Sequence, residues 1–242
     1  MNRLIKERIK RSGMWAFVII CLTIVISITI KYHFIGEVNM PFKPKELLVI
    51  SACEGLASSE ASEEYRWNLD LVQYNDIYIN FGKMNDDDVH IRNVRVENLK
   101  IEGIDGVKAY MPSPKEDTKF EYSDEYEISS SLTYKGGIQD DRKNLQISSK
   151  GGSIVFRVAN FNLGKLQSNA DEIIYDGRLL KEKEVSLEEL KFTLKFDIVL
   201  DTSNSIEYRG TFEVELPCGN IIEEGTSKID KTDLSDVIFK RD

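Results

Sequence analysis

One uncharged apolar run near the start of the chain constrains its fold more than any other feature. Residues 14–30 read MWAFVIICLTIVISITI, seventeen residues with no charge among them. A helix needs about 17 to 25 residues to cross a hydrocarbon core of about 30 Å, and a buried helix of a soluble protein seldom runs this long without a polar face. The run therefore predicts a transmembrane helix, which we place at residues 14–35 because the aromatic and apolar flank extends its reach.

The flanks of this run predict an uncleaved anchor and its orientation. No small-residue cleavage site follows in ISITIKYHFIG, as a secretory signal peptide would require. Five basic residues precede the run with only Glu7 against them, whereas Lys31 stands nearly alone after it. Cytoplasmic flanks carry the excess of Lys and Arg. We therefore expect a single-pass cell-membrane protein with residues 1–13 as a basic cytoplasmic tail and the C-terminal bulk extracytoplasmic.

Cys53 ends a stretch, Ile50 to Cys53, that looks like a lipoprotein processing box. Only four residues in series, Leu47 to Ile50, are apolar at this point, fewer than the roughly 7 to 15 of a signal core, so we assign Cys53 to the ectodomain rather than to a lipid anchor. Cys21 lies within the predicted span. Outside it, Cys53 and Cys218 either form a disulfide, which would contribute about 4 to 5 kcal/mol by closing a long loop, or remain separate thiols packed as small apolar residues.

The charge distribution excludes nucleic acid as a partner. The net charge is −9, and because the tail before the span carries five basic residues and one acid, the rest of the chain carries −13. Nucleic-acid binding normally leaves a basic footprint, since affinity comes largely from counterion release off phosphates. Beyond the span we expect a tether at residues 36–45, one folded domain at 46–226 and a loosely attached polar tail at 227–242.

Period-two alternation predicts that this domain is built from strands. In KFTLKFDIVLD and, after a short loop, IEYRGTFEVEL, apolar and polar residues alternate, as expected for an antiparallel pair with one solvated face. Gly210 within the second run indicates a bulge or a close backbone approach. Residues 67–81 predict a hairpin with its turn at Asn75 and Asp76. Ser186 is expected to cap one helical turn in SLEEL.

Weaker strand patterns complete the fold class. They occupy residues 47–53, 89–96, 99–102, 107–111, 120–133, 145–148 and 154–158. Many short strands separated by Gly and Pro turns are typical of an antiparallel sandwich. We therefore predict an all-β, antiparallel β-sandwich ectodomain, Ig-like in general architecture, preceded by one N-terminal transmembrane helix.

Catalytic and metal-binding motifs find little support. A Ser-His or Cys-His pair needs a histidine base, but His33 is expected at the membrane surface and His90 is expected to face solvent. No His or Cys cluster has the spacing of a zinc site. Asp86, Asp87 and Asp88 are weak calcium candidates, because consecutive residues on an extended chain diverge and the spaced ligands of an EF-hand are absent; a solvated acidic turn is the alternative.

Aromatic residues supply the candidates for an interface. Tyr65 and Trp67 are of the types that anchor protein interfaces, although core packing explains Trp67 equally well. In FEYSDEYE, the aromatic residues share one parity with Ile128, which favours burial over a recognition surface.

Three stretches, NMPFKPKELLVISACEG, FRVANFNLGKLQSN with YDGRLL, and ELPCGNIIEEGTS, resemble those of single-pass membrane-anchored proteins of clostridia and related low-GC Gram-positive bacteria. That group has no function to transfer, so the resemblance implies a Gram-positive envelope and nothing more.

The sequence thus predicts a binding or scaffold module of the bacterial cell envelope, with no catalysis and no cofactor. Its expected partners are the lipid bilayer, through residues 14–35, and an envelope protein. The alternatives are a wall- or carbohydrate-active enzyme with paired carboxylates, and a calcium-stabilised structural spacer. A fold alone does not name a function.

Overall fold

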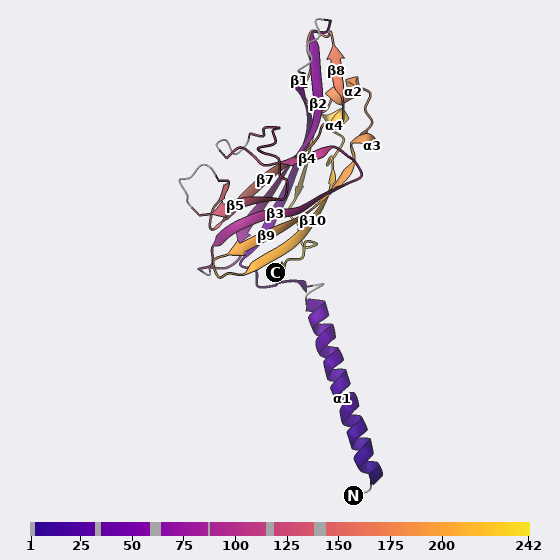
Figure 1. Ribbon diagram of the computed structural model, residues 1–242, viewed down its shortest axis with the longest axis vertical. Helices are drawn as coiled ribbons and strands as arrows, with labels where there is room; N and C mark the ends of the chain where they lie inside the picture. Colours follow the sequence, from indigo (N-terminus) through magenta and orange to yellow (C-terminus); the bar gives the residue numbers. More distant parts are fainter. Residues whose placement is uncertain (1–2, 32–34, 59–63, 87, 115–118, 138–143) are drawn as a thin grey trace.

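The computed structural model describes residues 3–31, 35–58, 64–86, 88–114, 119–137 and 144–242. One long helix, α1 (Arg3–Ile30), stands away from a β-rich body, and the C-terminus lies at the end of the body next to this helix (Figure 1). Within α1, the segment Gly13–Ile30 is long and apolar enough to cross a membrane, and its side chains are exposed. The helix also continues through the basic residues that were expected to form a separate tail.

The body consists of two sheets. Sheet A has the strand order β11 (Thr226–Lys231), β1 (Phe42–Ala57), β2 (Trp67–Lys83), β7 (Gly151–Asn160) and β4 (Val107–Tyr110), with β8 (Lys165–Ser168) also paired to β2. Sheet B has the order β12 (Lys240–Arg241), β10 (Glu207–Leu216), β9 (Phe192–Thr202), β3 (Ile91–Glu102), β5 (Ser131–Gly136) and β6 (Gln146–Ile147). All pairings are antiparallel except that of β5 with β6. A mostly β, sandwich-like body after one apolar helix is therefore confirmed.

The main core confirms the two clearest predicted strands. β9 and β10 pair with Phe196 opposite Phe212, and the two rings stack with centroids 5.3 Å apart. Phe156 of sheet A meets Phe196 edge-on at 5.1 Å, so aromatic packing joins the two sheets. Gly210 does mark a close approach, because a Cβ there would lie 2.6 Å from the ring of Phe239.

The predicted hairpin at residues 67–81 is wrong, since β2 runs without a turn through Asn75 and Asp76. Asn75 is fully buried and accepts a hydrogen bond of 2.7 Å from Ser51 Oγ on β1. Asp76 faces the other side of the sheet, where it pairs with Arg157. Partners within the sheet satisfy both polar side chains, so they do not form the turn that their residue types favour.

Other strand boundaries also differ from the expectation. Of the segment 120–133, only the end is in a strand, β5, and the rest lies as a loop with one bridge between Tyr110 and Glu127. The two strands expected at 89–102 form the single strand β3, whose register shifts between Glu97 and Lys100. The helical turn after Ser186 is present as α3 (Leu187–Leu190), but Ser186 donates to the Glu189 carboxylate rather than capping a backbone N–H.

A second, smaller core lies beyond the sandwich, at the end of the body farthest from α1. Here β1 and β2 extend past sheet B and carry β8 together with the short helices α2 (Leu179–Glu182), α3 and α4 (Ile221–Glu224) (Figure 1). Its buried members are Cys53, Leu69, Leu71, Leu166, Leu179, Leu180, Leu190, Ile221 and Ile222. We call this part of the body the distal end.

A fully buried polar band on β1, β2 and β7 separates the two cores. Ser51, Gln73, Asn75 and Asn160 all have zero exposure. Gln73 donates to the carbonyl of Leu190, and Asn160 donates to the side-chain oxygen of Gln73. Each of these polar groups is therefore hydrogen-bonded, as burial requires.

The C-terminal segment is a structural part of the body, which corrects the expectation of a loosely attached tail. It supplies β11 to sheet A and β12 to sheet B, and it buries Phe239. It also holds the residues that follow α1: the Glu37 N–H donates to the Phe239 carbonyl at 2.8 Å, and the Glu37 carboxylate lies 2.8 Å from Arg241 Nε. No sequence pattern indicated these pairings, because the segment is polar and two of its partners, β1 and Glu37, come from the opposite end of the chain.

We predict that Phe239→Ala destabilises the whole body. The ring is 6 % exposed and meets Phe212 edge-on, and truncation of a buried Phe costs about 3 to 5 kcal/mol. Urea unfolding of the full chain in detergent measures the change. Thr232→Ala, at an exposed position of the same segment, is the matched control and should shift the unfolding free energy by less than about 0.5 kcal/mol. Equal stabilities for the two variants would contradict the structural role of this segment.

Candidate functional site

The weak metal candidates and the two histidines are exposed where the structure describes them. Asp86 and Asp88 are exposed, and Asp87 lies outside the described residues. In the part of the chain that the structure describes, no group of three or more His, Cys, Asp or Glu side chains is placed to hold a metal ion. His90 is exposed, with its backbone N–H bonded to Ser203, and His33 lies outside the described residues.

The two ectodomain cysteines occupy different environments. Both are free thiols, with no disulfide between them. Cys53 is buried in the second core, and this burial raises the pKa of its thiol to about 12. Cys218 lies beside the polar band, where its backbone N–H donates to Ser51 Oγ at 3.0 Å and its thiol lies 3.6 Å from the Val49 carbonyl oxygen.

A buried guanidinium forms the densest polar cluster on the outer face of sheet A. Arg157 of β7 binds the Asp76 carboxylate through two hydrogen bonds, from Nε at 2.6 Å and from Nη2 at 2.9 Å. Its Nη1 donates to Glu54 at 3.1 Å and to the Tyr122 hydroxyl at 3.0 Å. Only 12 % of the Arg157 side chain is exposed and 11 % of that of Asp76. These charge-assisted bonds are of the strong, bidentate kind.

Aromatic rings close over this guanidinium. Its central carbon lies 3.9 Å from the ring centroid of Tyr74 and 4.5 Å from that of Phe120, within the range of a cation–π contact. The Tyr122 hydroxyl donates to Glu54, and burial raises the pKa of the Tyr122 phenol above its ordinary value. Because the hydrogen-bond donors of Arg157 are already bound by side chains of this chain, we interpret the cluster as structural. It holds the loop carrying Phe120 and Tyr122 on sheet A.

The aromatic residues of this loop follow the parity that the sequence indicated. Phe120, Tyr122, Tyr126 and Ile128 are all partly buried, while the residues between Tyr122 and Tyr126 are exposed. Phe120, Tyr122 and Tyr126 pack against a third apolar cluster on the outer face of sheet A. The stretch is therefore packed on the body.

An aromatic patch at the distal end is the best candidate for an interaction surface. Trp67 begins β2, and its ring meets the ring of Tyr175 edge-on with centroids 6.1 Å apart. Tyr175 is 52 % exposed and the adjacent Ile174 is 56 % exposed. Tyr65, the other predicted interface residue, is partly buried. We call Trp67, Ile174 and Tyr175 the distal patch.

Hydrogen bonds fix the strand end on which the distal patch stands. The Trp67 indole N–H donates to the Ala170 carbonyl at 2.8 Å, and Trp67 pairs with Ser168 of β8. Arg66 forms an ion pair with Asp171 at 2.7 Å. The sequence indicated Trp67 but missed Ile174 and Tyr175, because the segment 169–176 shows no period and its closeness to Trp67 follows only from the pairing of β8 with β2.

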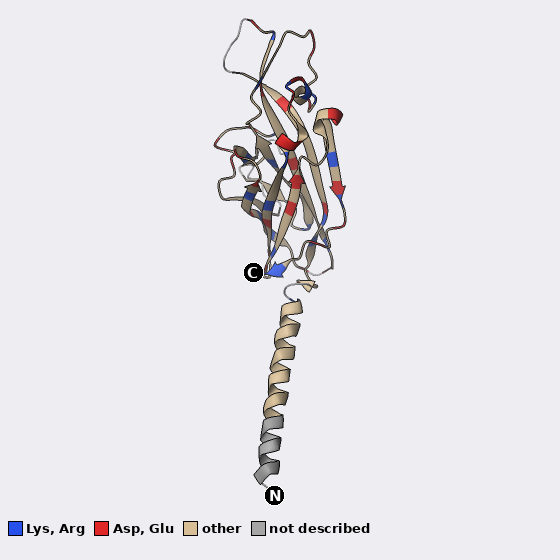
Figure 2. Cartoon of the chain, turned by 90° about the vertical axis from the view of Figure 1, so that its right-hand side faces the viewer, with Lys and Arg blue, Asp and Glu red and all other residues tan. Residues whose placement is uncertain are grey.

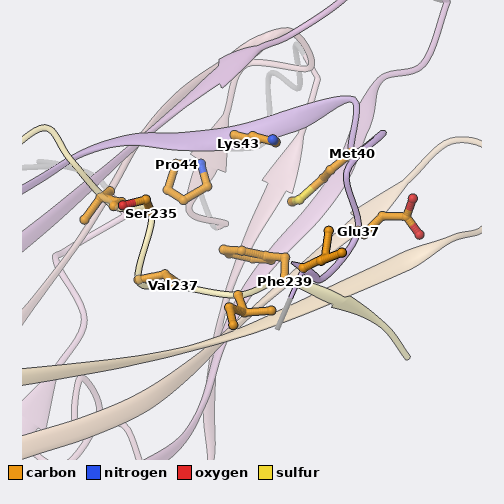
Figure 3. Close-up of a pocket in the computed structure, with 10 residues that line it drawn as sticks. Glu37, Met40, Lys43, Pro44, Ser235, Val237 and Phe239 are labelled. Carbon is orange, nitrogen blue, oxygen red and sulfur yellow. The ribbon is translucent and has the colours of Figure 1, made fainter. Parts of the chain in front are cut away.

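The opposite end of the body, beside α1, holds a cavity of about 350 Å³. Two parts of the chain enclose it (Figure 3). One is the start of β1 together with the residues just before it, and the other is the C-terminal segment. Met40, Pro44, Val237 and Phe239 line it with apolar groups, while Lys43 and Glu37 stand at its border (Figure 3). Such a volume falls at the small end of the range for ligand sites.

We predict that Arg157→Ala destabilises the body and releases the loop that it fastens. Asp76 would remain buried without its counter-charge, which costs about 3 to 5 kcal/mol. Urea unfolding reports the cost, and faster tryptic cleavage after Lys119 reports release of the loop. Arg66→Ala breaks an ion pair whose side chains are 57 % and 97 % exposed and should cost no more than about 1 kcal/mol. A loop equally resistant to trypsin in both variants would contradict the claim that Arg157 holds this loop on sheet A.

We also predict that Cys53 resists alkylation in the folded protein. The thiolate is the reactive form, and at pH 8 a thiol of pKa about 12 is ionised to only ~10⁻⁴, against about a quarter for an unperturbed thiol. A variant retaining Cys53 alone, with Cys21→Ser and Cys218→Ser, should therefore react with iodoacetamide slowly when native and rapidly in urea. Rapid native labelling would contradict the burial.

The same pKa difference predicts the direction of a pH effect. Between about pH 9 and 12 the unfolded thiol loses its proton while the folded one keeps it, so the unfolding free energy should fall as pH rises. In a parallel titration, Cys53→Ala should remove this part of the fall.

Comparison of the chain with protein-family models, with curated proteins and with solved structures gave no match. The geometry described above is therefore the basis on which its function is argued.

Proposed function

We propose that this protein is a single-pass envelope protein of a Gram-positive bacterium that presents a binding module outside the cytoplasmic membrane. The apolar segment Gly13–Ile30 would cross the membrane, with the N-terminus in the cytoplasm because five basic residues precede it. The two-sheet body, Ig-like in general architecture, would then lie outside. The absence of a small-residue cleavage site after the segment supports an anchor over a signal peptide.

The distal patch carries the proposal of binding. Tyr and Trp are enriched among the residues that anchor protein interfaces, and here an exposed Tyr175 stands on a half-buried Trp67 whose indole is already hydrogen-bonded. β2 alone spans about 55 Å at 3.3 Å per residue. The patch would therefore stand well above the lipid surface, within reach of another extracytoplasmic protein with an apolar surface.

The contacts of two carboxylates on sheet A favour a binding function over glycoside hydrolysis. Glycosidases need two carboxylates facing each other across a cleft. Glu54 and Asp76 are brought together on sheet A, but both are bound to Arg157 under a cover of aromatic rings. That arrangement commits both carboxylates to Arg157 and not to a sugar.

A photocrosslinking amino acid at position 175 tests this proposal in intact cells. We expect it to capture one defined extracytoplasmic protein, and we expect the same amino acid at Ile229, which is 46 % exposed on β11, to capture none. Removing an interface anchor commonly costs 2 kcal/mol or more, roughly a 30-fold loss of affinity, so Tyr175→Ala should abolish co-purification of the captured protein. Protease added to protoplasts should remove the body.

Two results would contradict the proposal. Equal capture from positions 175 and 229 would mean that the distal patch has no special affinity. A body that stays intact when protoplasts are treated with protease would mean that it is not extracytoplasmic.

A further inference from the structure

A basic hollow lies at the junction of α1 and the body. Its volume is about 230 Å³, and it is lined by Lys31, Gly36, Glu37, Asn39, Lys240 and Arg241. Lys31 follows the last residue of α1, whereas Lys240 and Arg241 form β12, the blue strand beside the C-terminus in Figure 2. The hollow thus joins cations from the two ends of the chain.

Two of these cations lack a counter-charge. The single carboxylate of the hollow, Glu37, already binds Arg241 at 2.8 Å. Among the described residues, Lys31 and Lys240 have no ion-pair partner. Lys31 is exposed and Lys240 is partly buried, and both residues line the hollow. The exposed Asn39 adds side-chain amide donors.

The cavity of about 350 Å³ shares Glu37 with the basic hollow. Apolar residues such as Met40 and Phe239 line it together with the charged Lys43 and Glu37 (Figure 3). A cationic hollow beside a cavity of mixed polarity suits the head region of an anionic lipid, which carries a phosphate and adjoining glycerol groups.

The position of the hollow favours a membrane lipid over a soluble anion as its ligand. Gly13–Ile30 has a length of about 27 Å as a helix, close to the thickness of a hydrocarbon core. With this segment in the bilayer, Lys31 lies at the level of the lipid headgroups, where basic side chains attract anionic lipids. A soluble ligand would have no reason to favour this place over the distal end.

We propose that the hollow binds the phosphate of an anionic phospholipid from the leaflet next to the body. Lys31 and Lys240 donate to the phosphate oxygens, and the adjoining cavity receives the glycerol of the head. One lipid then connects the end of α1 with β12 and holds the body at a fixed height over the bilayer. This inference rests on the membrane anchoring proposed above.

The test uses the full chain in nanodiscs made of phosphatidylcholine and phosphatidylglycerol. After gentle release into detergent, native mass spectrometry counts how many molecules of each lipid stay bound. We expect the wild type to retain phosphatidylglycerol preferentially. Each lysine near the surface contributes roughly fivefold, so Lys240→Gln should reduce the preference about fivefold, and Lys31→Gln with Lys240→Gln about 25-fold. Lys228→Gln, at an exposed lysine on β11, should leave it unchanged.

Three results would overturn the lipid site while leaving the anchor intact. The first is equal retention of the two lipids by the wild type in nanodiscs. The second is a preference that Lys31→Gln lowers and Lys240→Gln does not, since it would reflect ordinary attraction beside a membrane helix. The third is displacement of phosphatidylglycerol by inorganic phosphate, which would make the hollow a site for a soluble anion. A chain that fails to enter nanodiscs at all would instead overturn the anchoring itself.

Discussion

The pairing of β1 with β2 is the interaction on which the rest of the structure depends. The ladder runs from Phe42 opposite Lys83 to Ala57 opposite Leu69, over nearly the whole height of the body. Its inner face supplies Ile77 to the main core and Leu71 to the second core. Its outer face supplies the carboxylates that hold Arg157. A slip of one residue in β2 would exchange the two faces of that strand.

The buried polar band makes this register unique in a way that apolar residues alone would not. Ser51 and Asn75 stand directly opposite each other and share a hydrogen bond of 2.7 Å with no access to water. A slip of two residues keeps the same face of β2 inward, and both groups would then lose their partner while still buried, which costs about 1 to 3 kcal/mol for each. The band interrupts the apolar core, but it penalises such a slip.

The sequence predicts those parts of this fold that rest on local periodicity. β9 and β10 alternate cleanly and adjoin in the chain, so their pairing and inner face follow from the pattern alone. The continuity of β2 does not, because Asn75 and Asp76 look like a turn until Ser51 and Arg157 are known to lie beside them. The same limit applies to the C-terminal segment, whose strand β12 pairs with β10 and whose Phe239 packs on Phe212.

The candidate surfaces are also predicted only where the signal is local in the sequence. Trp67 is visible in the sequence as a large aromatic residue at the start of a strand, and the basic residues at the chain ends are visible as charges. Their neighbours are not, since Tyr175 meets Trp67, and Lys240 lines the same hollow as Lys31, only through pairings distant in sequence. Conversely, the acidic run at Asp86 and Asp88 is conspicuous in the sequence, and these two residues are exposed.

The connection between helix and body bears on which function the fold supports. A tether was expected at residues 36–45, but β1 begins at Phe42, and Glu37 is bound through its backbone to Phe239 and through its side chain to Arg241. Under the proposed function, a partner would therefore meet a distal patch on a body that is bound, at Glu37, to the residues following α1. Less freedom is lost on binding such a preorganised surface than on ordering a flexible one. A simple spacer would have no need of this restraint, whereas a module that presents one face to a partner gains affinity from it.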